Sequence, residues 1–130
     1  MAGALALTAI ACLHVAWAAG IEWGRAGAIP TVDGRPTLSP SRGATVLVAV
    51  LLLGAADLYI GAVHGRTPTW LFHVGSAVVA VVLVARAVGD FRTFGLFKKV
   101  RDTRFARLDT KIFIPLCLGL ALCGLAAALH

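Results

Sequence analysis

The chain has 130 residues, of which 59% are hydrophobic and only 14% are charged, a balance that excludes an ordinary water-soluble domain. Its formal net charge of +6 does not indicate a nucleic-acid partner, because the cations lie in the segments that connect long apolar runs. We therefore expect an integral membrane protein.

Four apolar runs follow one another along the chain, near 2–20, 44–62, 70–88 and 111–129. Each is long enough to cross a hydrocarbon core, which needs ~20 residues at about 1.5 Å of rise per residue. The sequence therefore predicts an all-α, polytopic membrane protein: one four-transmembrane-helix bundle that forms a single domain over 1–130. The first run also resembles a cleaved signal peptide, but no Lys or Arg precedes it, which favours a span that is retained.

The connections differ in composition. The first, 21–43, contains three prolines and an Asp-Gly pair, so we expect irregular structure there. The second, 63–69, is short enough for a tight turn between antiparallel helices. Within the fourth apolar run, Pro115 removes a backbone hydrogen bond, so we expect a kinked helix that begins near Thr110.

The third connection, 89–110, is a short basic segment between the third and fourth predicted helices. Phe91, Phe94 and Phe97 recur every three residues with cations between and after them, a pattern typical of a short helix lying in the membrane interface. Such a segment can bind anionic lipid headgroups. The alternative is that it only anchors the bundle and supplies the positive charge that cytoplasmic loops carry.

The distribution of Arg and Lys predicts the orientation. The first and third connections are rich in these residues, whereas the second contains only Arg66. An excess of Lys and Arg marks the cytoplasmic side of a membrane. We therefore expect 21–43 and 89–110 to be cytoplasmic, both termini to lie outside, and the protein to be integral to the cytoplasmic membrane.

Ionisable residues inside apolar runs are costly and indicate candidate sites. Asp57 shares one helical stripe with Gly54, Gly61 and His64, and small residues let another helix approach closely. We expect Asp57 to point into the bundle and to meet His73 as an intramembrane polar pair. The pair could relay a proton or bind a cation, or it could only satisfy two buried polar groups.

A second polar layer is expected near the cytoplasmic side. Arg86 and Asp90 are four residues apart, so on a helix they would share a face and pair. Arg86 could then clamp an anionic headgroup or a carboxylate, although helix ends often use such pairs only for folding. The candidate ligand-binding residues of this layer are His14, Trp17, Glu22, Arg86, Asp90, Arg92 and Asp109.

The sequence gives no sign of a metal or a cofactor, and we expect neither. The three cysteines lie inside apolar runs, and neither CxxC nor HxxxH spacing occurs. Two histidines at one depth, as a haem would need, could come only from two copies of His14 in a dimer. Phosphate-binding glycine loops and a GxSxG nucleophile are absent, so no motif specifies catalysis.

Two stretches carry a family resemblance: LHVAWAAGIEWG at 13–24, and RAVGDFRTFGLFKKVRDTRFARLDTKIFIPLCL at 86–118. They resemble a family of short bacterial membrane proteins known only as domain of unknown function 3995. The resemblance implies a four-span membrane protein and no particular activity. Where that family tends to have a Tyr-Ser pair before the proline, this chain has Phe113-Ile114 and lacks both hydroxyls. The positions that match the family pattern are His14, Trp17, Gly89, Asp90, Arg92, Asp109 and Pro115.

Three functions fit these observations. The first is the handling of a small solute, an ion or a lipid by a homo-oligomer, with membrane lipids and their anionic headgroups as partners. The second is a membrane enzyme for a lipid-soluble substrate, with His14 or Asp90 as acid or base and Arg86 as the anion clamp. The third is a structural or accessory subunit whose basic segment docks a partner.

Overall fold

The computed structural model describes residues 1–130, and most of the chain is helical. In chain order the elements are α1 (Ala2–Ala18), α2 (Arg25–Ala28), β1 (Thr31–Val32), β2 (Arg35–Pro36), α3 (Arg42–Val63), α4 (Thr69–Val88), α5 (Arg104–Leu108), a π-helical turn (Asp109–Phe113) and α6 (Ile114–Ala128). Three helical stretches are long and apolar enough to cross a membrane: α3, α4 and the continuous Arg104–Ala128. The fourth apolar helix, α1, is shorter, with 17 residues.

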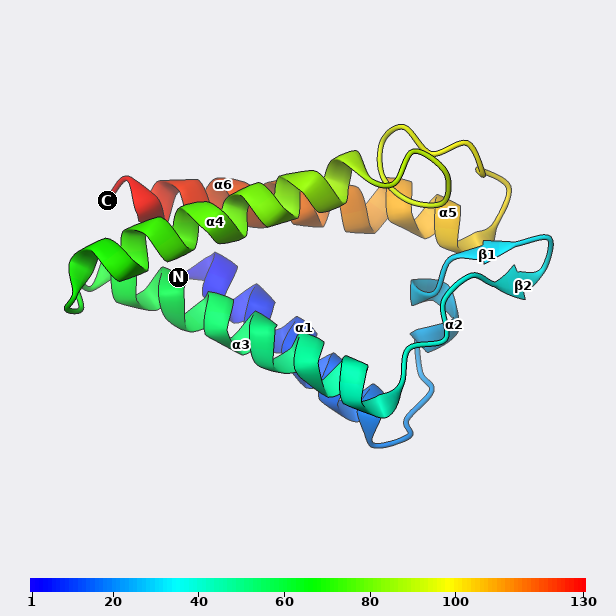
Figure 1. Ribbon diagram of the computed structural model, residues 1–130, viewed down its shortest axis with the longest axis horizontal. Coiled ribbons are helices and arrows are strands. Elements are labelled where there is room, and N and C mark those ends of the chain that lie inside the picture. The colour runs from blue at the N-terminus through cyan, green and yellow to red at the C-terminus, as the bar shows by residue number, and fades with distance from the viewer.

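The four long helices form two antiparallel pairs, α1 with α3 and α4 with α6 (Figure 1). The pairs meet at the end of the molecule that holds both termini and the turn between α3 and α4. They diverge toward the opposite end, where α2, the β1–β2 hairpin and α5 lie. Because α2 packs against α5, the first and third connections touch each other across this wider end.

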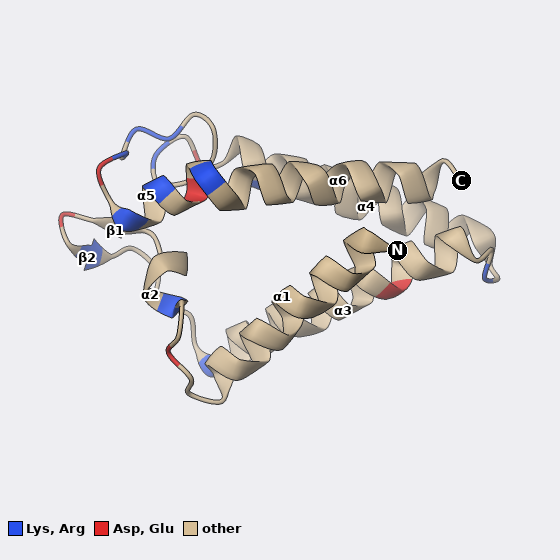
Figure 2. Ribbon diagram, turned by 180° about the vertical axis from the view of Figure 1, so that it is seen from behind, with Lys and Arg blue, Asp and Glu red and all other residues tan.

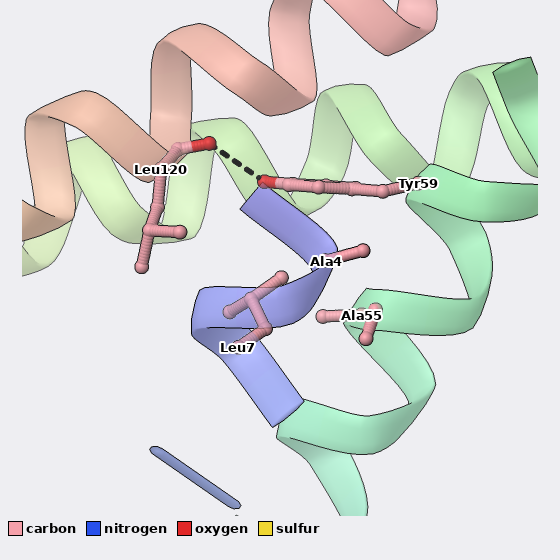
Figure 3. Packing of buried hydrophobic residues seen from close by; sticks show 6 residues of the cluster. Ala4, Leu7, Ala55, Tyr59 and Leu120 are labelled. Atoms are coloured by element: carbon pink, nitrogen blue, oxygen red, sulfur yellow. Dashed lines mark hydrogen bonds between the residues drawn. The ribbon is translucent and has the colours of Figure 1, made fainter. Parts of the chain in front are cut away.

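A small apolar cluster joins the two pairs near the termini (Figure 3). Within it, the hydroxyl of Tyr59 donates a hydrogen bond of 3.0 Å to the carbonyl oxygen of Leu120, and Tyr59 is only 4% exposed. Gly124 leaves room for the ring, since a Cβ there would lie 2.3 Å from the Tyr59 hydroxyl oxygen. Close approach at small residues therefore holds the junction together. The buried members of the cluster are Ala4, Leu7, Ala55, Ala56, Tyr59 and Leu120.

The last long helix begins earlier than the sequence predicted. The hydroxyl of Thr103 accepts the amide of Ala106 at 3.1 Å and caps a helix that starts at Arg104, so the predicted start near Thr110 was wrong. The chain then passes through the π-helical turn directly before Pro115, and the amide of Ile114 donates to the carbonyl of Asp109. A π-helical turn changes the hydrogen-bond register where proline would interrupt an α-helix.

Two predictions for the connections were also wrong. The first connection is not irregular throughout, because it contains α2 and the antiparallel β1–β2 hairpin, whose turn is Asp33-Gly34 with φ of 52° and 74°. The third connection has no helix from Phe91 to Phe97; its only helix before the π-helical turn is α5. The cause lies in the hydrogen bonds of its first residues, which form part of the candidate site.

Candidate functional site at the basic end

Most Lys and Arg residues gather at the wide end of the molecule, over α2, the hairpin, α5 and the third connection (Figure 2). The opposite end carries few charges. There Arg66, in the turn between α3 and α4, pairs with Asp57. The chemistry that distinguishes this chain from a plain apolar bundle therefore lies mainly at the wide end.

A charged cluster is buried where the third connection meets the last helix. The Asp109 side chain is completely buried, with 0% exposure. Its Oδ1 accepts a hydrogen bond of 3.0 Å from Nη2 of Arg86, and its Oδ2 accepts one of 3.1 Å from Nζ of Lys98. One carboxylate thus faces two cations, and the cluster of Arg86, Lys98 and Asp109 has a net charge of +1.

Lys98 ties the third connection to the helix. The residue is 3% exposed, and its Nζ also donates to the carbonyl of Gly95 at 3.1 Å and to the hydroxyl of Thr110 at 2.7 Å. The amide of Gly95 donates to Oδ2 of Asp109 at 2.8 Å. All three protons of the ammonium group therefore have an acceptor, as a buried cation requires.

The hydrogen-bond donors of Arg86 are less completely paired than those of Lys98. Its guanidinium lies over the ring of Phe94, with 4.6 Å between Cζ and the ring centroid. Its Nη1 is buried and has no hydrogen-bond partner, although the side chain as a whole is 32% exposed. Buried donors nearly always have an acceptor. Arg86 is therefore the member of the cluster that can take a further, negatively charged acceptor.

Asp90 closes a tight loop in the segment 89–95. Its Oδ1 accepts the backbone amides of Arg92, Thr93 and Phe94, and its Oδ2 accepts the hydroxyl of Thr93. Oδ1 thus holds the backbone of the loop and Oδ2 holds the Thr93 side chain, so the geometry gives Asp90 a structural role and not that of a general base. In a continuing α-helix the amides of Arg92, Thr93 and Phe94 would donate to backbone carbonyls instead. Because they donate to Asp90, the predicted interfacial helix does not form.

Two glycines make this closed loop possible. Gly89 and Gly95 have φ of 90° and 92°, a region that favours glycine. A Cβ on Gly89 would lie 2.0 Å from the carbonyl oxygen of Phe94, and one on Gly95 would lie 2.3 Å from that of Val88. Because Gly89 ends α4, Asp90 is not on the helix, and the predicted pairing of Arg86 with Asp90 was wrong.

The hydrogen bonds of Asp90 set the pH dependence of the loop. Partial burial raises the pKa of the carboxylate, but the hydrogen bonds from the Thr93 hydroxyl and from the amides of Phe94, Arg92 and Thr93 outweigh it and hold the pKa below its ordinary value of 3.8. The stabilisation is therefore present above that value and is lost as the pH falls through the lowered pKa of the folded protein.

We expect Asp90→Asn to speed hydrogen exchange of the amides of Arg92, Thr93 and Phe94 at pH 7, because the neutral amide is a weaker acceptor and cannot accept from two sides. Hydrogen exchange followed by mass spectrometry measures the effect. The matched control is Asp102→Asn, whose exposed side chain makes no ion pair in the same connection. Equal exchange rates in the wild type and Asp90→Asn would show that the carboxylate does not hold the loop.

An open cleft with a volume of about 440 Å³ lies between the closed loop and the β1–β2 hairpin with the two residues that follow it. Arg92 lines it and makes no ion pair, while Phe94 lines it from the side of the cluster. Phe94 therefore lines the cleft, and its ring also contacts Arg86. The full lining is Val32, Thr37, Leu38, Asp90, Arg92, Thr93 and Phe94.

The candidate residues from the first helix form a separate group. The Nδ1 of His14 donates to the carbonyl of Ile10 at 2.8 Å, and its ring lies 4.8 Å from that of Trp17. The Nε1 of Trp17 donates to the carbonyl of Trp23 at 2.7 Å, and Glu22 is exposed. No hydrogen bond or ion pair joins these residues to Arg86 or Asp109, so the expected single layer is divided in two.

The predicted polar pair at the other end does not form. Asp57 is exposed and pairs with Arg66, so it does not point into the bundle. His73 instead donates from Nδ1 to the carbonyl of Ala128 at 3.0 Å. The guanidinium of Arg66 also lies over the ring of Phe72, 5.0 Å from its centroid. The guanidinium of Arg66, in the short turn, can reach Asp57 and forms a charged hydrogen bond with its carboxylate.

Sequence reasoning missed Lys98 and Phe94. Lys98 stands beside Lys99 in a basic run, and nothing in the sequence distinguishes the buried lysine from the exposed one. Phe94 was expected only as part of a short helix in the membrane interface. No group of three or more His, Cys, Asp or Glu side chains lies close enough to hold a metal ion.

Neither the curated proteins nor the solved structures gave a match. The family model described as protein of unknown function (DUF3995) matches residues 7–124, which include the buried cluster, the closed loop and the cleft. The match confirms the resemblance seen in the two sequence stretches. The chain belongs to the DUF3995 family of proteins of unknown function.

Proposed function

We propose that this protein is a four-span integral protein of the cytoplasmic membrane that binds anionic lipid headgroups at its cytoplasmic end. Three stretches of membrane-spanning length and the apolar α1 support four spans. Both termini lie at one end of the helices, as an even number of crossings requires (Figure 1). The single domain then extends over 1–130, with 21–43 and 89–110 in the cytoplasm.

The excess of Arg and Lys at the wide end supports this orientation (Figure 2). Ser39 and Thr67 are both exposed and lie in connections at opposite ends of the helices. In a variant without native cysteines, we expect a membrane-impermeant maleimide to label Thr67→Cys in intact cells and to leave Ser39→Cys unlabelled. The reverse pattern would overturn the orientation.

The observation that carries lipid binding is the buried cluster with a net charge of +1 and the free Nη1 of Arg86, among exposed cations. The cytoplasmic leaflet presents anionic lipids, and juxtamembrane cations gain about 1 kcal/mol each from it. The rival, an enzyme with Asp90 as acid or base, is disfavoured because the carboxylate of Asp90 already holds the loop.

Native mass spectrometry tests the proposal on protein released from nanodiscs that contain equal amounts of phosphatidylglycerol and phosphatidylcholine. We expect retained adducts with the mass of phosphatidylglycerol and few with that of phosphatidylcholine. The same spectrum counts the chains in each complex, and we expect a homo-oligomer. Equal retention of both lipids, or retention of neither, would overturn the proposed lipid selectivity.

A further inference from the structure

The structure also suggests where a headgroup binds, an inference that rests on the proposed function. We propose that the cleft between the β1–β2 hairpin, with the two residues after it, and the closed loop 89–95 holds the phosphate of an anionic phospholipid. Arg92 is the ligand inside the cleft, and Arg86 is a second ligand behind the ring of Phe94. Arg92 has no ion-pair partner to release, and Arg86 keeps its bond from Nη2 to Asp109 while Nη1 has no partner.

The charges around the cleft favour an anion. Asp90 contributes one negative charge, but its oxygens accept four hydrogen bonds and turn toward the loop backbone. Arg92 carries a positive charge with no ion-pair partner. Behind Phe94, the cluster of Arg86, Lys98 and Asp109 adds a net +1. The two charges of opposite sign at Asp90 and Arg92 cancel, so the cluster leaves the region positive.

The donor geometry suits a phosphate diester. A guanidinium presents its N–H groups as a planar fork that matches two phosphate oxygens, and such bonds are about twice as strong as neutral ones. Arg92 offers this fork in the cleft, and Arg86 has the unpartnered Nη1. Phe94 lines the cleft and its ring lies under the Arg86 guanidinium, so we expect a change in its side-chain torsion to let both cations reach one anion.

The size and position of the cleft favour a lipid headgroup. Its volume of about 440 Å³ lies within the range of ~300–1,000 Å³ that small-molecule sites occupy. Val32 and Leu38 add apolar lining that the glycerol and the first carbons of the acyl chains can contact. The closed loop directly follows α4, which ends at Val88, so the cleft lies where headgroups meet a membrane helix.

The test is the same mass spectrometry on Arg92→Gln, with Arg101→Gln as the matched control. Both arginines are exposed, belong to one connection and make no ion pair, but only Arg92 lines the cleft. We expect Arg92→Gln to lower phosphatidylglycerol retention about tenfold, as the loss of a charged hydrogen bond implies, and Arg101→Gln to leave it unchanged. Full retention in Arg92→Gln alongside selective wild-type binding would overturn the site and leave the proposed function intact.

A second arm separates a lipid from free phosphate. Inorganic phosphate is titrated into the wild-type protein carrying phosphatidylglycerol, and we expect the lipid to remain because its glycerol and acyl carbons also contact the cleft. Displacement of the lipid, with binding of inorganic phosphate that Arg92→Gln abolishes, would assign the cleft to a soluble anion and overturn the lipid assignment.

The role of Arg86 is tested through Phe94, because this leaves the buried cluster in place. We expect Phe94→Ala to raise lipid retention by opening Nη1 of Arg86 to the cleft. Phe97→Ala, an exposed ring in the same connection that does not line the cleft, should have no effect. A folded Phe94→Ala protein that retains no more lipid than the wild type would remove Arg86 from the site.

Discussion

Asp109→Ala should lower the free energy of unfolding by about 3–5 kcal/mol, because it leaves two cations at a buried site without their counter-charge. Asp109 is fully buried, and Lys98 is nearly so. The change also removes the acceptor for the amide of Gly95, so the third connection loses its attachment to the last helix. Thermal unfolding in a mild detergent, followed by circular dichroism, measures the loss.

Two further variants separate the causes of this loss. Asp109→Asn keeps the shape of the side chain but removes the charge and one of its two acceptor oxygens, so we expect it to be destabilised almost as much as Asp109→Ala. Asp102→Ala removes an exposed carboxylate from the same connection and should change stability by less than about 0.5 kcal/mol. If Asp109→Ala unfolded at the same temperature as the wild type, the buried cluster would contribute nothing to stability.

The helices could be predicted because hydropathy reports directly on which segments can enter a membrane. Their ends could be predicted less well. Thr103 is a capping residue by type, and the helix that it caps starts at Arg104, six residues before the predicted start near Thr110. The basic composition of 104–107 masked this signal. The π-helical turn depends on hydrogen-bond register, which no composition window detects.

The candidate site could be predicted only in part, because spacing rules hold only while the helix continues. Arg86 and Asp109 were both expected in one polar layer, and the structure joins them. Asp90 was expected to pair with Arg86, but Gly89 ends the helix first, so the four-residue spacing no longer places the two on one face. At the other end, Arg66 lies in a turn of the chain and reaches Asp57 from outside the helix.

We expect Gly124→Ala to destabilise the junction between the two helix pairs by about 1–3 kcal/mol, the usual cost of overpacking. The added Cβ would lie 2.3 Å from the Tyr59 hydroxyl oxygen and 2.7 Å from Cζ, so the ring must move away from the carbonyl of Leu120. Gly119 is the matched control on the same helix, because a Cβ there meets nothing within 4 Å. In detergent, Gly119→Ala should unfold at the same temperature as the wild type.

A double-mutant cycle with Tyr59→Phe shows whether the hydroxyl is the group that Gly124 accommodates. Tyr59→Phe alone should cost about 1 kcal/mol for the lost hydrogen bond to Leu120. In that background the atom nearest to the new Cβ is gone, so Gly124→Ala should cost less than in the wild type. Equal costs in both backgrounds would mean that the ring atoms, and not the hydroxyl, set the cost of the alanine.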